Sequence, residues 1–393
     1  MNVKGFKFSA VEAAIKKPGR LDLALIFSEV PAVTAAVYTT NRVKAAPVLL
    51  SMERTRDGRG QALVVNSGNA NACTGGQGMS DAVETAALVA EGLGIHEDLV
   101  LVASTGVIGK TLPMERLRAA VPGLVEGMSH AGLDGVARAI MTTDTFPKTE
   151  SVTGEAGGKT YRIAGMAKGA GMIMPNMATM LSFLVSDAAI EPDLLRRLFR
   201  EAVDSSFNVI TIDGDTSTND TALLMANGMA GNPLIREGTP EAELFGRLLQ
   251  ETLLSLARQI VRDGEGATKF VEIRVRRAVS HSDAKRAAMA VANSLLVKTA
   301  FFGQDANWGR ILAAVGYSGS EIDQDLVSLY FDDVRMVSDG VFAGGDAEAR
   351  GTEALRKKEF TVTVDLGLGE GAATVYTSDL SHDYVSINAD YRT

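Results

Sequence analysis

The stretch that most constrains the fold is KGAGMIMPNMATMLSFL, residues 168–184. Its first part is rich in glycine and its last part is apolar, which predicts a flexible segment that leads into a buried strand. Thr179, at the junction, is the only side chain there that could act as a nucleophile. By itself it is more typical of a strand threonine, because β-branched residues favour strands.

Outward from this stretch, signals for strands and helices alternate. Short apolar runs and alternating patterns predict strands at 62–65, 99–102, 271–275 and 360–364. Apolar stripes predict helices at 81–92 after a Ser80 cap, from Pro192 onward, at 239–264, and from a Ser282 cap to about 296. The alternation indicates an α/β or α+β class with mixed sheets.

Length and composition indicate an ordinary globular protein. The 393 residues suggest two or three domains at roughly 100–200 residues each. The net charge is −9 and the basic residues are scattered, which disfavours nucleic acid and anionic lipid as partners. Cys73 is the only cysteine, so no internal disulfide can form, and we expect it to be a small buried residue. Without a signal peptide or a long apolar run, we expect a cytoplasmic protein.

Several local motifs suggest other functions. Residues 104–111 end in Gly-Lys-Thr, like a phosphate-binding loop, but Ser104 stands where the first glycine belongs. A nucleotide-binding protein that uses Lys110 therefore remains an alternative. Residues 213–218 begin like a calcium loop, but Thr218 replaces the glycine that its sharp turn needs. The four histidines show no metal-ligand spacing, so we expect no metal.

Six longer motifs occur across nearly the whole chain. They are 66–75 (NSGNANACTG), 103–109 (ASTGVIG), 140–145 (IMTTDT), 213–220 (DGDTSTND), 263–269 (DGEGATK) and 388–393 (NADYRT). Together with residues 168–184, they resemble the ornithine acetyltransferase family, also called glutamate N-acetyltransferase. The motifs stand in the order of the family, with no departure at a functional position.

The resemblance implies a self-processing, N-terminal-nucleophile-like α/β enzyme of arginine biosynthesis. Its expected fold is a layered sandwich of mixed sheets flanked by helices, with a smaller C-terminal α/β domain from about residue 280. Cleavage between Ala178 and Thr179 would leave one chain of residues 1–178 and another of 179–393. It would also free the Thr179 α-amine, whose pKa of roughly 7.7–8.0 suits a base for the hydroxyl of the same residue.

The implied reaction is ping-pong transfer of acetyl from N-acetylornithine to glutamate through acetyl-Thr179, and acetyl-CoA is a possible co-substrate. No bound cofactor is expected. The alternative with the same nucleophile is an aminopeptidase or amidohydrolase, which would pass the acyl group to water. The family also implies a heterotetramer of two α and two β chains, with small-molecule substrates and no nucleic acid or membrane partner.

The site residues are carried over by motif. Thr105 and Gly106 would form the oxyanion hole, with a hydroxyl and a backbone N–H as donors. The residues that would bind substrate are Thr142, Lys168, Thr179, Glu265, Asn388 and Thr393. Lys168 can pair with a carboxylate, and Glu265 with an ammonium group or a transferring proton. Whether the Thr179 amine or Glu265 handles the proton stays open at this point.

Overall fold

A computed structural model describes residues 2–174 and 180–390 of the chain. The described chain forms two compact units. Unit 1 comprises residues 1–208 and 215–260, and unit 2 comprises residues 209–214 and 261–393.

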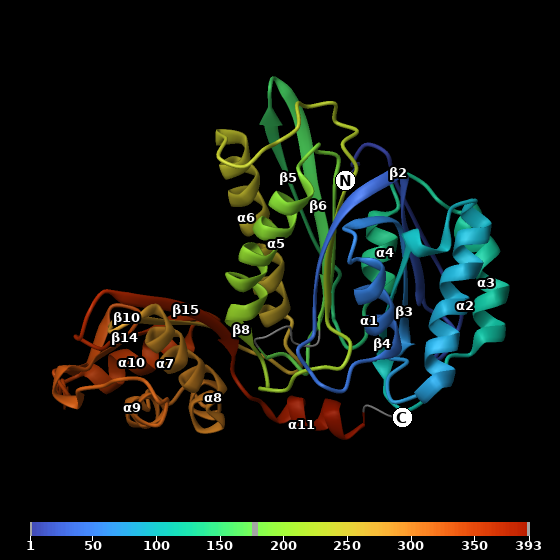
Figure 1. Cartoon of the computed structure of the whole chain (residues 1–393). Helices are drawn as coiled ribbons and strands as arrows, with labels where there is room; N and C mark the ends of the chain where they lie inside the picture. Colours follow the sequence, from blue (N-terminus) through green and yellow to red (C-terminus); the bar gives the residue numbers. More distant parts are fainter. Residues whose placement is uncertain (1, 175–179, 391–393) are drawn as a thin grey trace. The chain divides into compact units, whose positions relative to one another are not determined.

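Unit 1 is built on one mixed sheet (Figure 1). In the described residues its strand order is β4-β3-β2-β9-β7-β6-β5, and β1 pairs with β2 outside this path. The strands are β1 (Phe6–Val11), β2 (Leu23–Tyr38), β3 (Arg59–Asn69), β4 (Val100–Val107), β5 (Lys148–Ala156), β6 (Lys159–Lys168), β7 (Leu181–Ser186) and β9 (Thr221–Ala226). The strand predicted at 62–65 is part of β3, and the strand predicted at 99–102 is β4 from Val100 onward, since Leu99 ends a short 3-10 helix.

The long strand β2 shapes this sheet. Its first part, Leu23–Phe27, pairs with β3, and its last part, Val33–Tyr38, pairs with β9. Between them the register shifts around Pro31, which has no N–H to donate to a ladder. A flat strand of this length would hold its ends about 50 Å apart. In Figure 1, β2 is instead strongly curved as it passes from β3 to β9.

The sheet of unit 1 is buried on both faces. Leu63 and Val65 of β3 belong to one core cluster, and Val64 between them belongs to another. Burial on both faces requires near-continuous apolar strands, which is the pattern that the sequence shows here. The helices of this unit are α1 (Ala46–Arg54), α2 (Gly75–Leu93), α3 (Met114–Glu126), α4 (Leu133–Ala139), α5 (Pro192–Asp204) and α6 (Pro240–Arg262).

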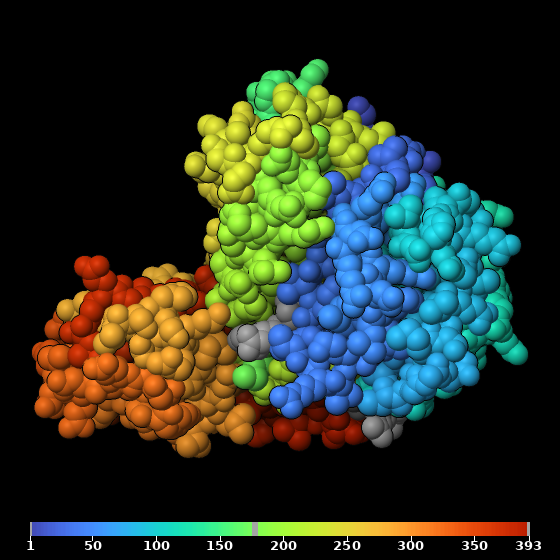
Figure 2. Space-filling model, in the orientation of Figure 1, coloured from blue at the N-terminus to red at the C-terminus, as the bar shows by residue number. Residues whose placement is uncertain are grey.

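These helices are amphipathic and cover the sheet. Helix α5 begins at Pro192 as predicted and buries Leu195 and Phe199. The outer faces of α2 and α5 lie at the surface of unit 1 in Figure 2. The predicted Ser80 cap is wrong: α2 begins at Gly75, and Ser80 lies inside the helix with its hydroxyl donating to the Gly76 carbonyl. A serine within a helix can make this bond to the fourth residue before it.

Unit 2 is a second, smaller α/β layer. Its described strand order is β13-β12-β11-β14-β10-β15-β8. The strands are β8 (Ile210–Thr211), β10 (Phe270–Ala278), β11 (Ser328–Phe331), β12 (Val334–Ser338), β13 (Val341–Phe342), β14 (Glu359–Asp365) and β15 (Gly371–Ser378). The helices are α7 (His281–Asn293), α8 (Leu295–Phe302), α9 (Trp308–Gly316), α10 (Ala347–Arg356) and α11 (His382–Ala389).

The alternating patterns predicted at 271–275 and 360–364 are β10 and β14, which pair in parallel. The predicted Ser282 cap is wrong by two residues. Ser280 caps α7 by accepting from the Asp283 N–H, and Ser294 caps α8, so the predicted helix is two helices. Both serines adopt extended backbone angles, as N-caps require.

The predicted mixed α/β class is confirmed, with two mixed sheets flanked by helices. The boundary between the predicted chains, after Ala178, does not coincide with the boundary between the units. Strand β6 precedes that bond and β7 follows it, yet the two pair side by side within unit 1. No described helix is long and apolar enough to cross a membrane.

Candidate functional site

The ends of β3 and β4 form the first part of the site. The two strands are parallel, so Ser67 and Thr105 lie at the same edge of the sheet, followed by Gly68 and Gly106. Gly106 has φ +135°, and a Cβ there would lie 2.3 Å from the Gly68 carbonyl carbon. No side chain fits this close approach, so the Thr105-Gly106 turn requires glycine at its second position.

Lys168, at the end of β6, joins this edge. Its Nζ donates to the Thr142 hydroxyl at 2.8 Å and to the Thr105 hydroxyl at 3.5 Å. Lys168 and Thr105 are buried, and Thr142 is half-buried. Lys168 therefore contacts two other residues that are expected to act on substrate. One of them, Thr105, lies 63 positions away in the sequence. Because the ammonium donates to both hydroxyl oxygens, each hydroxyl hydrogen can be directed to a third group.

The buried carboxylate of Asp144 is hydrogen-bonded to the backbone next to this cluster. Asp144 Oδ1 accepts from Lys148 Nζ and from the Gly169 N–H, each at 2.7 Å, and Oδ2 accepts from the Thr142 N–H at 3.0 Å. Both side chains of the Asp144–Lys148 pair are fully buried. Burial alone would raise the pKa of Asp144, but the positive charges of Lys168 and Lys148 and the Gly169 N–H outweigh it and lower the pKa to about 2.

Asp144 and Lys148 are residues of this cluster that sequence reasoning missed. Asp144 stood within the matched 140–145 motif without a role, and Lys148 lies outside it. The available signal was the i,i+4 spacing of opposite charges in a segment that carries Thr142. The carboxylate bonds directly to the backbone of Thr142 and of Gly169, the neighbour of Lys168, so it fixes both ends of the Lys168–Thr142 contact.

Part of the predicted site lies outside the described residues. These are the cleavage-site residues Ala178 and Thr179 and the substrate-binding residue Thr393. Met180, which follows Thr179 in the chain, is described, and its N–H donates to Asp220 Oδ1 at 3.0 Å.

Unit 2 brings together the other two predicted residues. Asn388 of α11 donates from Nδ2 to Glu265 Oε2 at 2.7 Å. Glu265 lies in a loop with Gly266 at φ +67°, where a Cβ would lie 2.6 Å from the Tyr384 N. Ser381 donates from its hydroxyl to the Gly266 carbonyl at 2.6 Å. The loop is thus held against the start of α11, which keeps the side chains of Glu265 and Asn388 within hydrogen-bonding distance.

Asp379 secures the same loop further along. Its Oδ1 accepts from the backbone N–H groups of Thr268 and Lys269 at 2.8 and 2.9 Å. Asp379 is buried and follows the end of β15. A carboxylate that holds two successive amides restricts the backbone of the 263–269 motif, and this restriction positions Glu265.

The nucleotide-binding alternative finds no support in the geometry of residues 104–111. Strand β4 continues to Val107, and α3 begins only at Met114, so the Gly-Lys-Thr run does not open directly into a helix. The Gly109 N–H donates to the Ala72 carbonyl at 3.0 Å and is already engaged. A phosphate-binding loop needs its amides directed at the ligand. The expectation of a buried Cys73 is wrong, because Cys73 is exposed.

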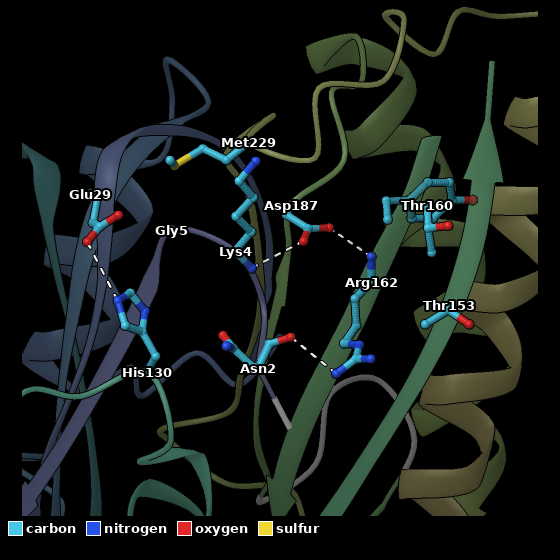
Figure 3. Close-up of a pocket in the computed structure, with 11 residues that line it drawn as sticks. Asn2, Lys4, Gly5, Glu29, His130, Thr153, Thr160, Arg162, Asp187 and Met229 are labelled. Carbon is cyan, nitrogen blue, oxygen red and sulfur yellow. Dashed lines mark hydrogen bonds and ion pairs between the residues drawn. The ribbon is translucent and has the colours of Figure 1, made fainter. Parts of the chain in front are cut away.

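A cavity of about 590 Å³ in unit 1 lies away from these residues (Figure 3). It is lined by residues near the N-terminus and by Arg162 and Asp187, and none of the predicted site residues lines it. Asp187 accepts the backbone N–H groups of Lys4 and Arg162 at 3.1 and 2.7 Å, which ties the N-terminal segment to β6. Its carboxylate therefore has a structural use.

The fold and the cluster define a class: a mixed α/β protein in which strand ends bring a buried ammonium to two hydroxyl groups. Comparison with known proteins specifies the family. The sequence model of the ArgJ family matches residues 7–393, and the chain belongs to this family.

The relatives agree over the full length. The chain is 72% identical to the arginine biosynthesis bifunctional protein ArgJ of Geobacter sulfurreducens, with all of both chains covered. A crystal structure of the protein of that name from Bacillus halodurans is 40% identical, with a TM-score of 0.52 over 54% of this chain and 99% of that chain. Ornithine acetyltransferase of Mycobacterium tuberculosis, solved with ornithine, is 42% identical, with a TM-score of 0.39 over 44% of this chain and 92% of that chain.

Proposed function

We propose that this chain transfers acetyl from N-acetylornithine to glutamate through an acetyl-Thr179 intermediate, after cutting itself between Ala178 and Thr179. As a member of the ArgJ family it is an enzyme of arginine biosynthesis that acts on small molecules. The contact of Lys168 with the Thr105 and Thr142 hydroxyls is the observation that carries the proposal.

Cleavage begins when the Thr179 hydroxyl oxygen attacks the Ala178 carbonyl carbon. The peptide C–N bond then breaks, the Thr179 nitrogen takes up a proton, and an ester joins the two residues. Water hydrolyses the ester, which leaves a carboxylate on Ala178 and both a free amine and a hydroxyl on Thr179. An α-amine with a pKa near 8 is partly neutral at physiological pH, so it can accept the hydroxyl proton in later cycles.

Acetyl transfer then takes two matched steps. The Thr179 oxygen attacks the acetyl carbonyl of N-acetylornithine, the amide bond breaks, and ornithine leaves with a proton on its nitrogen. The glutamate amine attacks the acetyl-enzyme, the ester bond breaks, and Thr179 regains its proton. Each step passes through a tetrahedral oxyanion. We assign the Thr105 hydroxyl and the Gly106 N–H as its donors.

Lys168 supports this assignment by its charge and its contacts. As a buried ammonium that donates to the Thr105 hydroxyl, it polarises that hydroxyl toward a developing oxyanion. We assign Lys168 and Thr142 to the carboxylate end of the amino-acid substrates. Glu265 carries the opposite charge, and we assign it, with Asn388, to the substrate ammonium group.

The length of a relative supports cleavage. The Bacillus halodurans chain is matched over 99% of its length by 54% of this chain. Residues 179–393 are 215 of the 393 residues here, which is nearly the same share. That chain thus has the length expected of one cleavage product.

Two further assignments complete the proposal. The relatives are called bifunctional, which supports acetyl-CoA as a second acetyl donor to glutamate. We also propose that two copies of each fragment assemble into a heterotetramer. Native mass spectrometry of the cut protein checks the assembly, and initial rates with acetyl-CoA and glutamate check the second activity.

The central experiment compares the wild type with Thr179→Ala. Purified wild-type protein should give two bands on a denaturing gel, and N-terminal sequencing of one should begin with Thr179. Thr179→Ala should stay intact and inactive. Parallel rates with glutamate and with water as acceptor distinguish the transferase from an amidohydrolase. An intact wild-type chain with full transfer activity would refute the proposal.

A further inference from the structure

The last two residues of the 213–220 motif, Asn219 and Asp220, have no role in the mechanism above. They stand directly before β9 in unit 1 and are both buried, with 5% and 1% of their surface exposed. Burying an amide and a carboxyl costs free energy unless each finds hydrogen-bond partners. Their partners therefore indicate what the motif holds in place.

Asn219 holds the strand that carries the oxyanion donors. Its Nδ2 donates to the Ser104 carbonyl at 2.9 Å and to the Ala70 carbonyl at 2.6 Å. Its Oδ1 accepts from the Thr218 hydroxyl, which fixes the orientation of the amide. Ser104 immediately precedes Thr105, so Asn219 fixes the backbone one peptide bond before the proposed oxyanion donors.

Asp220 holds the chain beside the nucleophile. Its Oδ1 accepts the Met180 N–H at 3.0 Å, and its own carbonyl accepts the Thr39 N–H at 3.0 Å. The Met180 carbonyl accepts in turn from the Thr221 N–H at 3.2 Å. Met180 immediately follows Thr179, so Asp220 fixes the backbone one peptide bond after the predicted nucleophile.

We propose that Asn219 and Asp220 are positioning residues that set the distance between the oxyanion donors and the nucleophile. The inference rests on the proposed function. Adjacent Cα atoms lie about 3.8 Å apart across a trans peptide, so the separation of the two residues is fixed. One end of this short rigid link holds Ser104 and the other holds Met180. Catalytic geometry is sensitive to such supports, because a displacement of about 1 Å can cost about a hundredfold in rate.

The Asp220 carboxyl serves this role as an acceptor. Burial raises its pKa well above the ordinary value, against the opposing effects of the Met180 N–H, Thr39 and Lys168. A neutral carboxyl still accepts through its carbonyl oxygen. An asparagine side chain has the same shape and the same acceptor, so it should replace Asp220 in this task.

The test compares three changes at these positions. Asp220→Ala removes the acceptor and should slow self-cleavage and lower the kcat of cut protein about a hundredfold, with a smaller change in KM. Asp220→Asn keeps the acceptor and should retain cleavage and at least a third of the kcat. Asn219→Asp directs an oxygen at two carbonyls and should lower kcat at least tenfold.

Matched controls distinguish a loss of kcat caused by misplaced catalytic groups from one caused by a general loss of stability. Asp81→Ala removes another buried carboxyl of unit 1, and Asn232→Asp changes another buried amide that donates to two carbonyls. Both controls should lose thermal stability as the test variants do, yet keep kcat within about threefold when folded. Near-UV circular dichroism identifies the folded samples, and Asn219→Asp decides the matter if Asp220→Ala does not fold.

The outcomes are distinct. A wild type without cleavage or acetyl transfer contradicts the proposed function itself. An active wild type whose Asp220→Ala and Asn219→Asp variants keep full kcat overturns the positioning role. Asp220→Asn as inactive as Asp220→Ala also overturns it, because the acceptor would then not be the property that matters.

Discussion

Asp144 shows how one buried carboxylate can hold several parts of the cluster in place. Its carboxylate accepts from Lys148, from the backbone of Thr142 and from the backbone of Gly169. These bonds are made by the ionised form. Its pKa is lowered to about 2, so the stabilisation exists above the ordinary pKa of 3.8 and disappears as the pH falls from there through about 2.

Asp144→Asn should therefore destabilise the protein strongly at neutral pH. It leaves the buried Lys148 ammonium without its carboxylate, and breaking a buried pair in this way costs about 3–5 kcal/mol. Urea unfolding at several pH values checks this, and the difference from wild type should shrink below about pH 4. Glu84→Gln, which breaks the exposed pair with Arg118, is the control and should leave the urea midpoint nearly unchanged. A difference that does not change with pH would contradict the charge argument.

Thr105 carries a prediction about catalysis. Removing its hydroxyl with Thr105→Ala should lower kcat by about 10²–10³, as the loss of one oxyanion donor does elsewhere. Thr105→Ser keeps the hydroxyl and is the matched control. Rates of acetyl transfer from N-acetylornithine to glutamate on cut protein measure both. If the alanine and serine variants were equally active, Thr105 would have no role as a donor.

At the scale of elements, the parallel pair β3–β4 determines the shape of the Thr105-Gly106 turn. Gly106 sits where the two backbones approach most closely, at φ +135°, and a Cβ added there would lie 2.3 Å from the Gly68 backbone. The register of the pair shifts at Gly68 and Asn69, which is where the strands separate. The pairing of β3 with β4 thus leaves no room for a Cβ atom at position 106.

Gly106→Ala should consequently disrupt the turn, with kcat lowered at least tenfold and a loss of stability beyond that of an ordinary glycine change. Gly109→Ala is the control: Gly109 also has positive φ, at +84°, but a Cβ there meets nothing within 4 Å. Thermal unfolding and transfer rates on both variants give the comparison. Equal effects of the two substitutions would show that φ alone, and not the contact with Gly68, is what matters.

At the scale of the whole molecule, the predicted cut runs through unit 1. Lys168 to Ile163 of β6 pair antiparallel with Leu181 to Ser186 of β7, and every residue of β7 is buried. One fragment would contribute β6 and the other β7. Separating them would expose the sheet of unit 1 and break its ladder.

The two fragments should therefore stay together after cleavage. Cut wild-type protein should elute from a sizing column as one peak that contains both fragments, at the volume of uncut Thr179→Ala. The fragments should separate only in denaturant. Two peaks under native conditions would show that the β6–β7 ladder does not hold them.

Periodicity and motifs in the sequence determined the local elements and the chemistry. The apolar run at 62–65 and residues 100–102 of the run at 99–102 lie in strands buried on both faces. Helix starts were less certain, as Ser80 and Ser282 show, since several nearby residues could each cap a helix. Periodicity and capping signals depend on a few neighbouring residues, so they can be identified from the sequence alone.

Only the tertiary structure decided which distant residues meet. Lys168 at the end of β6 meets Thr105 of β4, Asp144 bonds to the backbone at both ends of the Lys168–Thr142 contact, and Asn219 with Asp220 links two strand ends. Each of these contacts depends on how far a sheet curves and which strands become neighbours. Those quantities come from packing over the whole unit, and no pattern of a few residues contains them.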